Sequence, residues 1–263
     1  MKTLILAGGY GTRISEESHL KPKPMLEIGG QPILWHIMKR YSAYGYNDFI
    51  ILAGYKQHVI KEYFADYYLH RADITFDFAA DNKLIVHTAA SEPWKVTVVD
   101  TGLETLTGGR VKRAQKYVGD EAFMLTYGDG VADIDLNKLL EFHKTHGKTA
   151  TLTAVGVTQR FGVIEISNSG VVTDFREKGA ADGSVINGGF FVFNSGIFDL
   201  LEGDDTILER KIFETLAQRN ELFAYKHDGF WQCMDTKRDK DFLERLWDEG
   251  NAPWAVKDGE RIF

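Results

Sequence analysis

The hydrophobic and polar positions along the chain predict an alternation of strands and helices in its first half. The apolar run from Thr3 to Ala7 is short and ends at glycines, as a buried strand does. Residues 31–45 carry apolar side chains at helical spacing, and Gly45 would end that helix. The continuous apolar run 48–53 is typical of a strand buried on both faces. This order predicts a largely parallel sheet with right-handed crossovers, covered by helices.

The same pattern continues to about residue 157, and the chain then becomes richer in β structure. We expect further helices over 56–70, 109–118 and 135–146, strands over 122–127 and 149–157, and short strands and loops over 74–107. After residue 160, the turn 168–170 predicts a hairpin between 163–166 and 171–176. The remaining pattern predicts strands over 188–193 and 222–226, an apolar stretch over 230–235, and helices over 205–219 and 237–249.

No Pro/Ser-rich linker divides the chain, so we expect a single α/β domain with a β-rich C-terminal half. We place the first half at 1–157, the second at 158–250 and a tail at 251–263. The tail is too short to be a domain and is a candidate interface arm.

A glycine-rich turn directly after the first strand is the most informative motif. Residues 6–13 have the sequence Leu-Ala-Gly-Gly-Tyr-Gly-Thr-Arg, and Lys-Pro-Lys-Pro-Met follows at 21–25. Backbone N–H groups with no Cβ in the way, closed by Arg13 and Lys23, predict a cradle for a polyphosphate. A dinucleotide fingerprint would need glycine where Ile14 stands, and a P-loop would need it where Phe142 stands. A plain strand-to-turn connection would need neither of the two cations.

Composition and charge narrow the choice of partners. The formal net charge of −7 argues against nucleic acid or an anionic membrane as the main partner. An acidic chain must therefore bind a polyphosphate through local cations or a divalent metal. The single cysteine, Cys233, permits no internal disulfide and fits a reducing cytoplasm. The N-terminal apolar run is too short for a signal peptide, and no stretch approaches the ~18 apolar residues of a membrane span. We expect a soluble cytoplasmic protein.

Two carboxylates follow apolar stretches and are candidate metal ligands. Asp129 stands between two glycines after the strand 122–127, and Asp235 ends the stretch 230–235. Ligands of parallel sheets bind beyond the carboxyl ends of the strands, so Asp129 and the glycine-rich loop are expected in one crevice. Two carboxylates can hold Mg²⁺ while phosphate oxygens and water complete the octahedron. The local alternatives are a turn aspartate for Asp129 and a helix N-cap for Asp235.

Two residue pairs and two single residues have both a chemical and a structural interpretation. Glu177-Lys178 is either an acid–base pair or a solvated strand end. Asn187 suits hydroxyl recognition, although Asn-Gly is also an ordinary turn. We interpret His143 and His146 as surface residues at a helix end, because no third metal ligand accompanies them. Cys233 is interpreted as a packed thiol, because no histidine partner for a nucleophile is evident.

Taken together, these motifs resemble the sugar-1-phosphate nucleotidyltransferases over essentially the whole chain. The start at residues 6–13 is shared by the wide superfamily. More specific stretches, which favour its cytidylyl branch over the uridylyl and thymidylyl branches, are 21–25, 31–36, 107–110, 127–130, 186–191 and 229–232. One departure is Gly179, where the family usually has a proline after Glu-Lys. The resemblance implies a mixed, mostly parallel sheet with a Rossmann-like half, and a homo-oligomer.

The resemblance also implies a role for each matching residue. The nucleotide would contact Leu6, Ala7, Gly8, Gly9, Tyr10, Gly11, Thr12, Arg13, Lys23, Thr105, Thr107, Gly109, Arg110 and Gly128. The sugar phosphate would contact Gly162, Glu177, Lys178 and Asn187. Asp129 and Asp235 would hold Mg²⁺, and the catalytic residues would be Arg13, Lys23, Asp129 and Asp235. The first half of the chain would thus bind the nucleotide and the second half the sugar phosphate.

The reaction implied by the resemblance is transfer of CMP from CTP to α-D-glucose 1-phosphate, giving CDP-glucose and pyrophosphate. The sugar phosphate is already ionised near neutral pH, so its attack on the α-phosphorus needs no general base. Positioning and charge stabilisation by Mg²⁺, Lys23 and Arg13 would supply the catalysis. The alternatives are a uridylyl- or thymidylyltransferase on the same sugar phosphate and a non-catalytic nucleotide-sensing subunit. Such subunits tend to lose the metal carboxylates or the phosphate lysine, which this chain retains.

Overall fold

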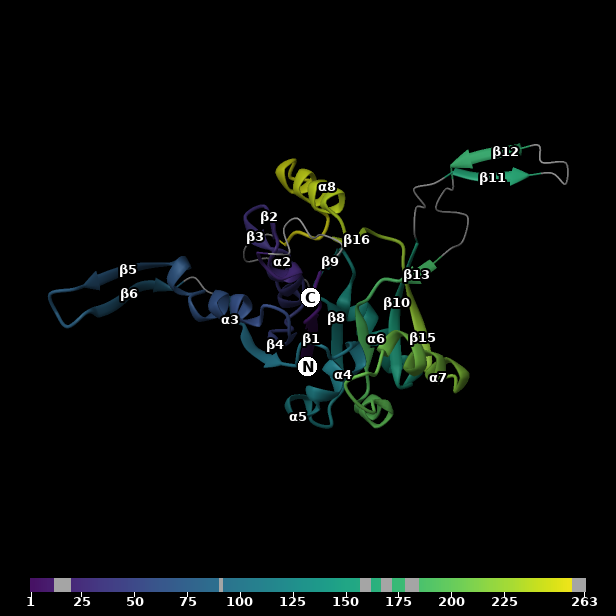
Figure 1. Ribbon diagram of the computed structural model, residues 1–263, viewed down its shortest axis with the longest axis horizontal. Helices are drawn as coiled ribbons and strands as arrows, with labels where there is room; N and C mark the ends of the chain where they lie inside the picture. Colours follow the sequence, from purple (N-terminus) through teal and green to yellow (C-terminus); the bar gives the residue numbers. More distant parts are fainter. Residues whose placement is uncertain (12–19, 90–91, 157–161, 167–171, 178–184, 257–263) are drawn as a thin grey trace.

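A mixed eight-stranded sheet forms the centre of the molecule (Figure 1). The computed structural model describes residues 1–11, 20–89, 92–156, 162–166, 172–177 and 185–256. The strands lie in the order β13 (Val185–Asn187), β10 (Ala150–Gly156), β14 (Phe191–Phe193), β8 (Phe123–Tyr127), β1 (Lys2–Ala7), β4 (Asp48–Ala53) and β7 (Lys95–Asp100), and β15 (Leu222–His227) also pairs with β10. The mostly parallel sheet predicted from the sequence is thereby confirmed.

The parallel part of the sheet brings several strand ends to one edge. β1 pairs in parallel with β4 and with β8, and β4 pairs in parallel with β7. In this register Leu6 lies opposite Leu52 on one side and Tyr127 on the other. β14 is antiparallel to both β8 and β10, which makes the sheet mixed. The segments that follow β1 and β8 therefore emerge side by side.

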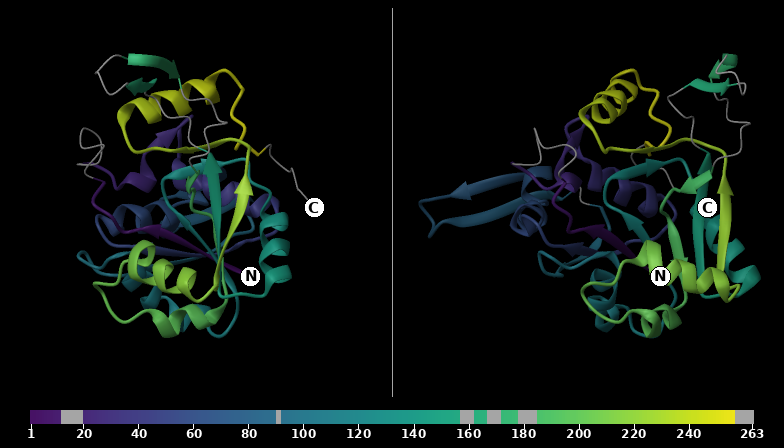
Figure 2. Two further views of the ribbon diagram at one scale, coloured as in Figure 1. Left: turned by 90° about the vertical axis from the view of Figure 1, so that its right-hand side faces the viewer. Right: turned by 45° about the vertical axis from the view of Figure 1, so that its right-hand side comes forward.

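Helices cover both faces of this sheet (Figure 2). They are α2 (Ile33–Ala43), α3 (Gln57–Ala65), α4 (Thr107–Arg113), α5 (Gln115–Val118), α6 (Leu136–His146), α7 (Phe213–Gln218) and α8 (Lys237–Asp248), with shorter turns η2 (Lys23–Met25), η3 (Leu69–Arg71), η5 (Ser195–Leu200) and η6 (Leu208–Ile212). Alternate residues of β1 face different hydrophobic clusters: Ile5 packs with α2 and α6, whereas Leu4 and Leu6 pack with α4, α5 and α7. Burial on both faces explains why this strand is continuously apolar.

Among the described residues, four two-stranded pairs accompany the central sheet. They are β2 (Glu27–Ile28) with β3 (Gln31–Pro32), β5 (Ala72–Asp77) with β6 (Lys83–Ala89), β9 (Gly130–Ala132) with β16 (Trp231–Cys233), and β11 (Gly162–Ile166) with β12 (Val172–Glu177). The β5–β6 hairpin extends away from the body of the molecule (Figure 1). The strands of the predicted hairpin 163–176 are confirmed, whereas its turn lies outside the described residues. The division of the chain into two halves stays a prediction.

Three predicted elements are wrong in their extent. The helix expected over 56–70 ends at Ala65, and the helix expected over 205–219 begins only at Leu208. The strand expected over 188–193 begins at Phe191, because positive φ angles of 76° and 51° at Gly189 and Phe190 form a bend before it. Apolar spacing identified each element, but its ends were set by backbone conformation that the spacing does not contain.

Two interpretations of surface residues also change. His143 is buried, with its Nδ1 2.8 Å from Thr151 Oγ1, and His146 stacks on Phe223 with ring centroids 4.3 Å apart. The interpretation of His143 as a surface residue is therefore wrong, because the end of α6 packs against β10 and β15, whereas His146 stays partly exposed. In the tail, Trp254 is 1% exposed and stacks on Phe230. This part of the tail is anchored in its own core.

No helix in the described part of the chain is long and apolar enough to span a membrane.

Candidate active site

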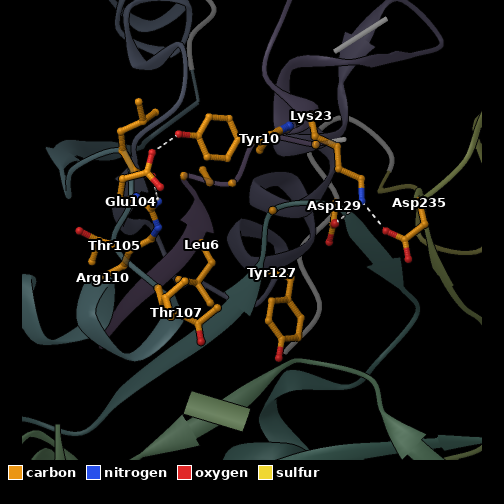
Figure 3. A pocket seen from close by; sticks show the side chains of 18 residues that line it. Leu6, Tyr10, Lys23, Glu104, Thr105, Thr107, Arg110, Tyr127, Asp129 and Asp235 are labelled. Atoms are coloured by element: carbon orange, nitrogen blue, oxygen red, sulfur yellow. Dashed lines mark hydrogen bonds and ion pairs between the residues drawn. The ribbon is translucent and has the colours of Figure 1, made fainter. Parts of the chain in front are cut away.

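A pocket of about 510 Å³ opens where β1 and β8 end (Figure 3). It is lined by Leu6, Ala7, Gly8, Gly9, Tyr10, Gly11, Lys23, Pro24, Leu103, Glu104, Thr105, Leu106, Thr107, Arg110, Tyr127, Gly128, Asp129 and Asp235. The glycine-rich loop, Lys23 and the two candidate metal carboxylates, which are far apart in the sequence, thus meet in one crevice. This is the position at which parallel α/β sheets bind ligands.

Close backbone packing at the pocket wall explains two of its glycines. The N–H of Gly128 donates to the carbonyl of Leu6 at 2.9 Å, and a Cβ at Gly128 would lie 2.7 Å from that oxygen. A Cβ at Gly8 would lie 2.1 Å from the guanidinium of Arg110. A side chain at either position would therefore push the strand ends apart or displace Arg110. Glycine is therefore required at both positions by close packing against the protein itself.

A pair of short strands brings the two carboxylates together. Asp129 directly precedes β9, and Asp235 follows β16 after one residue. β9 and β16 are antiparallel, and the N–H of Met234 donates to the carbonyl of Asp129 at 2.8 Å. The N-cap alternative for Asp235 is wrong, because Thr236 caps α8 and forms a capping box with Asp239. Asp235 is thus placed on the pocket and not used to begin the helix.

Lys23 bridges these two carboxylates in the pocket (Figure 3). Its Nζ lies 2.6 Å from Asp129 Oδ2 and 2.5 Å from Asp235 Oδ1. Burial by itself would lower the pKa of Lys23, but the two carboxylates outweigh it and raise that pKa above its ordinary value. The ammonium is therefore charged at neutral pH. One cation is already held between the two oxygens.

The same oxygens fit a divalent metal ion. The Lys23 ammonium shows that the two carboxylates converge closely enough to share one cation, and hard cations such as Mg²⁺ prefer carboxylate oxygens. Within the described ranges, no group of three or more His, Cys, Asp and Glu side chains could hold a metal. A metal held by Asp129 and Asp235 would therefore take its other ligands from water and a bound phosphate.

Cys233 lies beside this cluster but is a poor nucleophile. Burial, with Asp235 and Asp129 adding to it, raises the pKa of its thiol to about 12. A thiol with so high a pKa is protonated at neutral pH, and only the thiolate is reactive. The interpretation of Cys233 as a packed thiol agrees with this environment.

The opposite wall of the pocket is formed by the segment after β7. Arg110 is buried there and donates to Thr101 Oγ1 at 2.5 Å and to the carbonyl of Gly102 at 2.7 Å. Its guanidinium thus supports the backbone of the segment that carries Thr105. Gly109 lies behind this wall, where a Cβ would be 2.7 Å from the backbone of Asp204, and it does not line the pocket.

Several residues of the site were not found from the sequence. Glu209 accepts hydrogen bonds from Thr107 Oγ1 at 2.6 Å and from the Tyr127 hydroxyl at 2.7 Å. The Asn187 amide donates to the same Tyr127 hydroxyl at 3.3 Å. This network connects the pocket wall to β13. For Tyr127, its position at the end of a strand was the one sequence feature that could have indicated a place in the pocket. The sequence around Glu209 contains no feature that predicts its hydrogen bonds.

Tyr10 and Glu104 form a second contact that the sequence did not indicate. The Tyr10 hydroxyl donates to Glu104 Oε1, and this bond joins the glycine-rich loop to the segment after β7 (Figure 3). The two residues lie at the end of the pocket away from Asp129 and Asp235.

The residues expected to bind a sugar phosphate are only partly placed. Asn187 donates a hydrogen bond to Tyr127, which lines the pocket. Gly162 and Glu177 lie opposite each other at one end of the β11–β12 pair. Lys178, Thr12 and Arg13 lie outside the described residues.

Comparison with known proteins identifies the family. The sequence model described as Nucleotidyl transferase matches residues 2–245. The chain belongs to the nucleotidyl transferase family. This nucleotidyltransferase is 58% identical to a glucose-1-phosphate cytidylyltransferase of Salmonella typhimurium, over 97% of the chain and 99% of that relative. It is 44% identical to a probable glucose-1-phosphate cytidylyltransferase of Bacillus subtilis, over 97% and 100% of the two chains.

The fold of this nucleotidyltransferase is also found among solved structures. A UDP-glucose pyrophosphorylase from Acinetobacter baumanii superimposes with a TM-score of 0.68, covering 94% of this chain and 92% of the other. The two sequences are only 18% identical, so the likeness concerns the fold. The Rossmann-like sheet predicted from the resemblance is confirmed.

Proposed function

We propose that this enzyme transfers CMP from CTP to α-D-glucose 1-phosphate and releases pyrophosphate. The observation that carries the proposal is the convergence of Lys23, Asp129 and Asp235 at one end of the pocket that the glycine-rich loop lines. The choice of substrates follows the relative from Salmonella typhimurium, which shares 58% of its residues over almost the full length of both chains.

The pocket can be divided by the charge that each part offers. The backbone of Gly8, Gly9 and Gly11 would receive the phosphates, and Lys23 would contact the α-phosphate. The base would lie at the other end, against the segment that Arg110 supports. Asp129 and Asp235 would hold Mg²⁺, which supplies charge stabilisation for the reacting phosphate. These local cations would allow a chain with a net charge of −7 to bind two anionic substrates.

The bond changes need no acid–base residue. A phosphate oxygen of glucose 1-phosphate forms a bond to the α-phosphorus of CTP, and the bond from that phosphorus to the bridging oxygen of pyrophosphate breaks. The nucleophile is already an anion, and pyrophosphate leaves as an anion. Lys23 would stabilise the charge that is redistributed on the α-phosphate, and Arg13 would bind the phosphates. The protonated thiol of Cys233 takes no part in this scheme.

The sugar phosphate would be held by residues of the second half. We assign this role to Gly162, Glu177, Lys178 and Asn187. Asn187 would act from a fixed position, because its amide side chain is tied to Tyr127 and its Oδ1 accepts from the N–H of Gly189 at 3.0 Å.

Comparison of CTP with UTP tests the proposed function. We expect kcat/KM for CTP to exceed that for UTP on the order of 10²-fold or more, because polar groups that fit one base edge are left unpaired by the other. A pyrophosphate-release assay with glucose 1-phosphate and each of the four nucleoside triphosphates measures the ratio. Equal values for CTP and UTP would reject the cytidylyl assignment, and activity with UTP or dTTP alone would support the alternative branches.

We also propose that the enzyme is a homo-oligomer. Phe76 and Phe78 on the β5–β6 hairpin are 57% and 80% exposed, and their rings stack with centroids 6.4 Å apart. A two-stranded hairpin is marginally stable alone in water, and exposed apolar clusters mark interaction surfaces. We expect sedimentation velocity to show a species larger than the 29.7 kDa chain, and Phe76→Ser with Phe78→Ser to weaken it. A monomer at micromolar concentration would exclude this proposal.

A further inference from the structure

The Lys23 ammonium lies between the two carboxylates that are the candidate metal ligands. Its two close contacts, at 2.6 Å and 2.5 Å, are to Asp129 Oδ2 and Asp235 Oδ1. The Lys23 side chain is only 12% exposed, whereas the side chains of Asp129 and Asp235 are 28% and 32% exposed. The ammonium is therefore shielded from water, and the two carboxylates remain open to the pocket. A divalent ion would need the same oxygens at the shorter distance of about 2.0–2.1 Å that Mg²⁺ requires.

The backbone around Lys23 is held in place, so the ammonium must move by rotation of the side chain. Pro22 precedes the turn η2, and the buried Pro24 follows Lys23 within it. The N–H of Met25 donates to the carbonyl of Pro22 at 2.8 Å, which closes the turn. Two prolines restrict the backbone, whereas the four-carbon stem of lysine rotates freely enough to place its charge elsewhere.

We propose that Lys23 excludes divalent metal from Asp129 and Asp235 until a nucleoside triphosphate draws its ammonium away. An ammonium and a divalent metal held by the same two carboxylates would repel each other at contact distance, so each opposes the binding of the other. The polyphosphate supplies both an anion for Lys23 and oxygens that complete the metal's coordination. Lys23 is thus an internal counterion in the free enzyme and a phosphate ligand in the complex.

The consequence is positive coupling between metal and nucleotide. If the nucleotide releases the carboxylates, it raises the affinity of the site for metal, and by linkage the metal raises the affinity for nucleotide by the same factor. The identity of the anion as a nucleoside triphosphate rests on the proposed function. The competition between Lys23 and metal does not depend on which base is bound.

Binding of Mn²⁺ without any nucleotide tests this competition. Electron paramagnetic resonance of free Mn²⁺ would be used to titrate the wild type, Lys23→Met and, as a control, Lys21→Met. Lys21 belongs to the same loop, but it is 48% exposed and pairs with Glu27. We expect Lys23→Met to bind Mn²⁺ more tightly than the wild type, on the order of 10- to 100-fold, because one repelling charge is removed. Lys21→Met should match the wild type.

The outcomes separate the inference from the proposed function. The inference would be overturned if the Lys23→Met variant bound Mn²⁺ no more tightly than the wild type, even if the enzyme uses CTP. Binding of Mn²⁺ by the wild type in the micromolar range without nucleotide would also overturn it. This measurement uses the wild type alone and does not depend on the folding of any variant. Tight binding by Lys23→Met in an enzyme that prefers UTP would support the inference and reject the cytidylyl assignment.

Discussion

Asp129→Asn and Asp235→Asn should each lower metal-dependent turnover by about 10²- to 10³-fold or more. The two carboxylates converge on one cation, so removing either charge would leave a metal with too few anionic ligands. Pyrophosphate release at saturating Mg²⁺ and saturating substrates measures the loss. The double variant should be little worse than either single variant, because the two side chains act as one unit.

A matched control variant shows whether the loss of turnover comes from these two carboxylates or from the removal of any negative charge. Asp241→Asn removes a carboxylate from an exposed position of α8 and should turn over like the wild type. Circular dichroism and urea unfolding of the site variants should show an intact fold. Near-wild-type turnover of Asp129→Asn or Asp235→Asn at saturating Mg²⁺ would contradict the metal assignment.

Lys23→Ala should lower kcat by about 10²- to 10³-fold, because its contact with the α-phosphate strengthens in the transition state. Lys178→Ala should act differently and raise KM for glucose 1-phosphate. A charge-assisted hydrogen bond is worth roughly 1.5–3 kcal/mol, which corresponds to about 10- to 150-fold. Steady-state kinetics with each substrate varied in turn distinguishes the two effects.

Lys21→Ala is the control for this pair of variants. Lys21 lies two residues from Lys23, forms an exposed ion pair with Glu27 and does not line the pocket, so we expect unchanged kinetics. If Lys178→Ala weakened CTP and left the sugar phosphate unaffected, the proposed division between a nucleotide side and a sugar-phosphate side would be wrong.

The sequence by itself determined the class of the fold and one side of the site. The apolar runs of β1, β4 and β8 predict buried parallel strands, because a strand covered by helices on both faces has no polar side. The glycine-rich loop at 6–11 and Lys23 were found because their role depends on local backbone conformation and charge. Strand-end geometry also placed Asp129 beside that loop.

Only the tertiary structure decided which distant residues meet. Asp235 reaches Asp129 through the β9–β16 pairing, and Glu209 reaches Tyr127 from a turn 82 residues away in the chain. Local spacing could not separate Asp235 as a ligand from Asp235 as an N-cap, nor show that His143 is buried. These outcomes depend on strand register and on which helix face packs inward, and both are set by burial across the whole sheet. The ion pairs of Lys23 with both carboxylates could likewise not be predicted from local sequence, because they form only when three separate segments fold together.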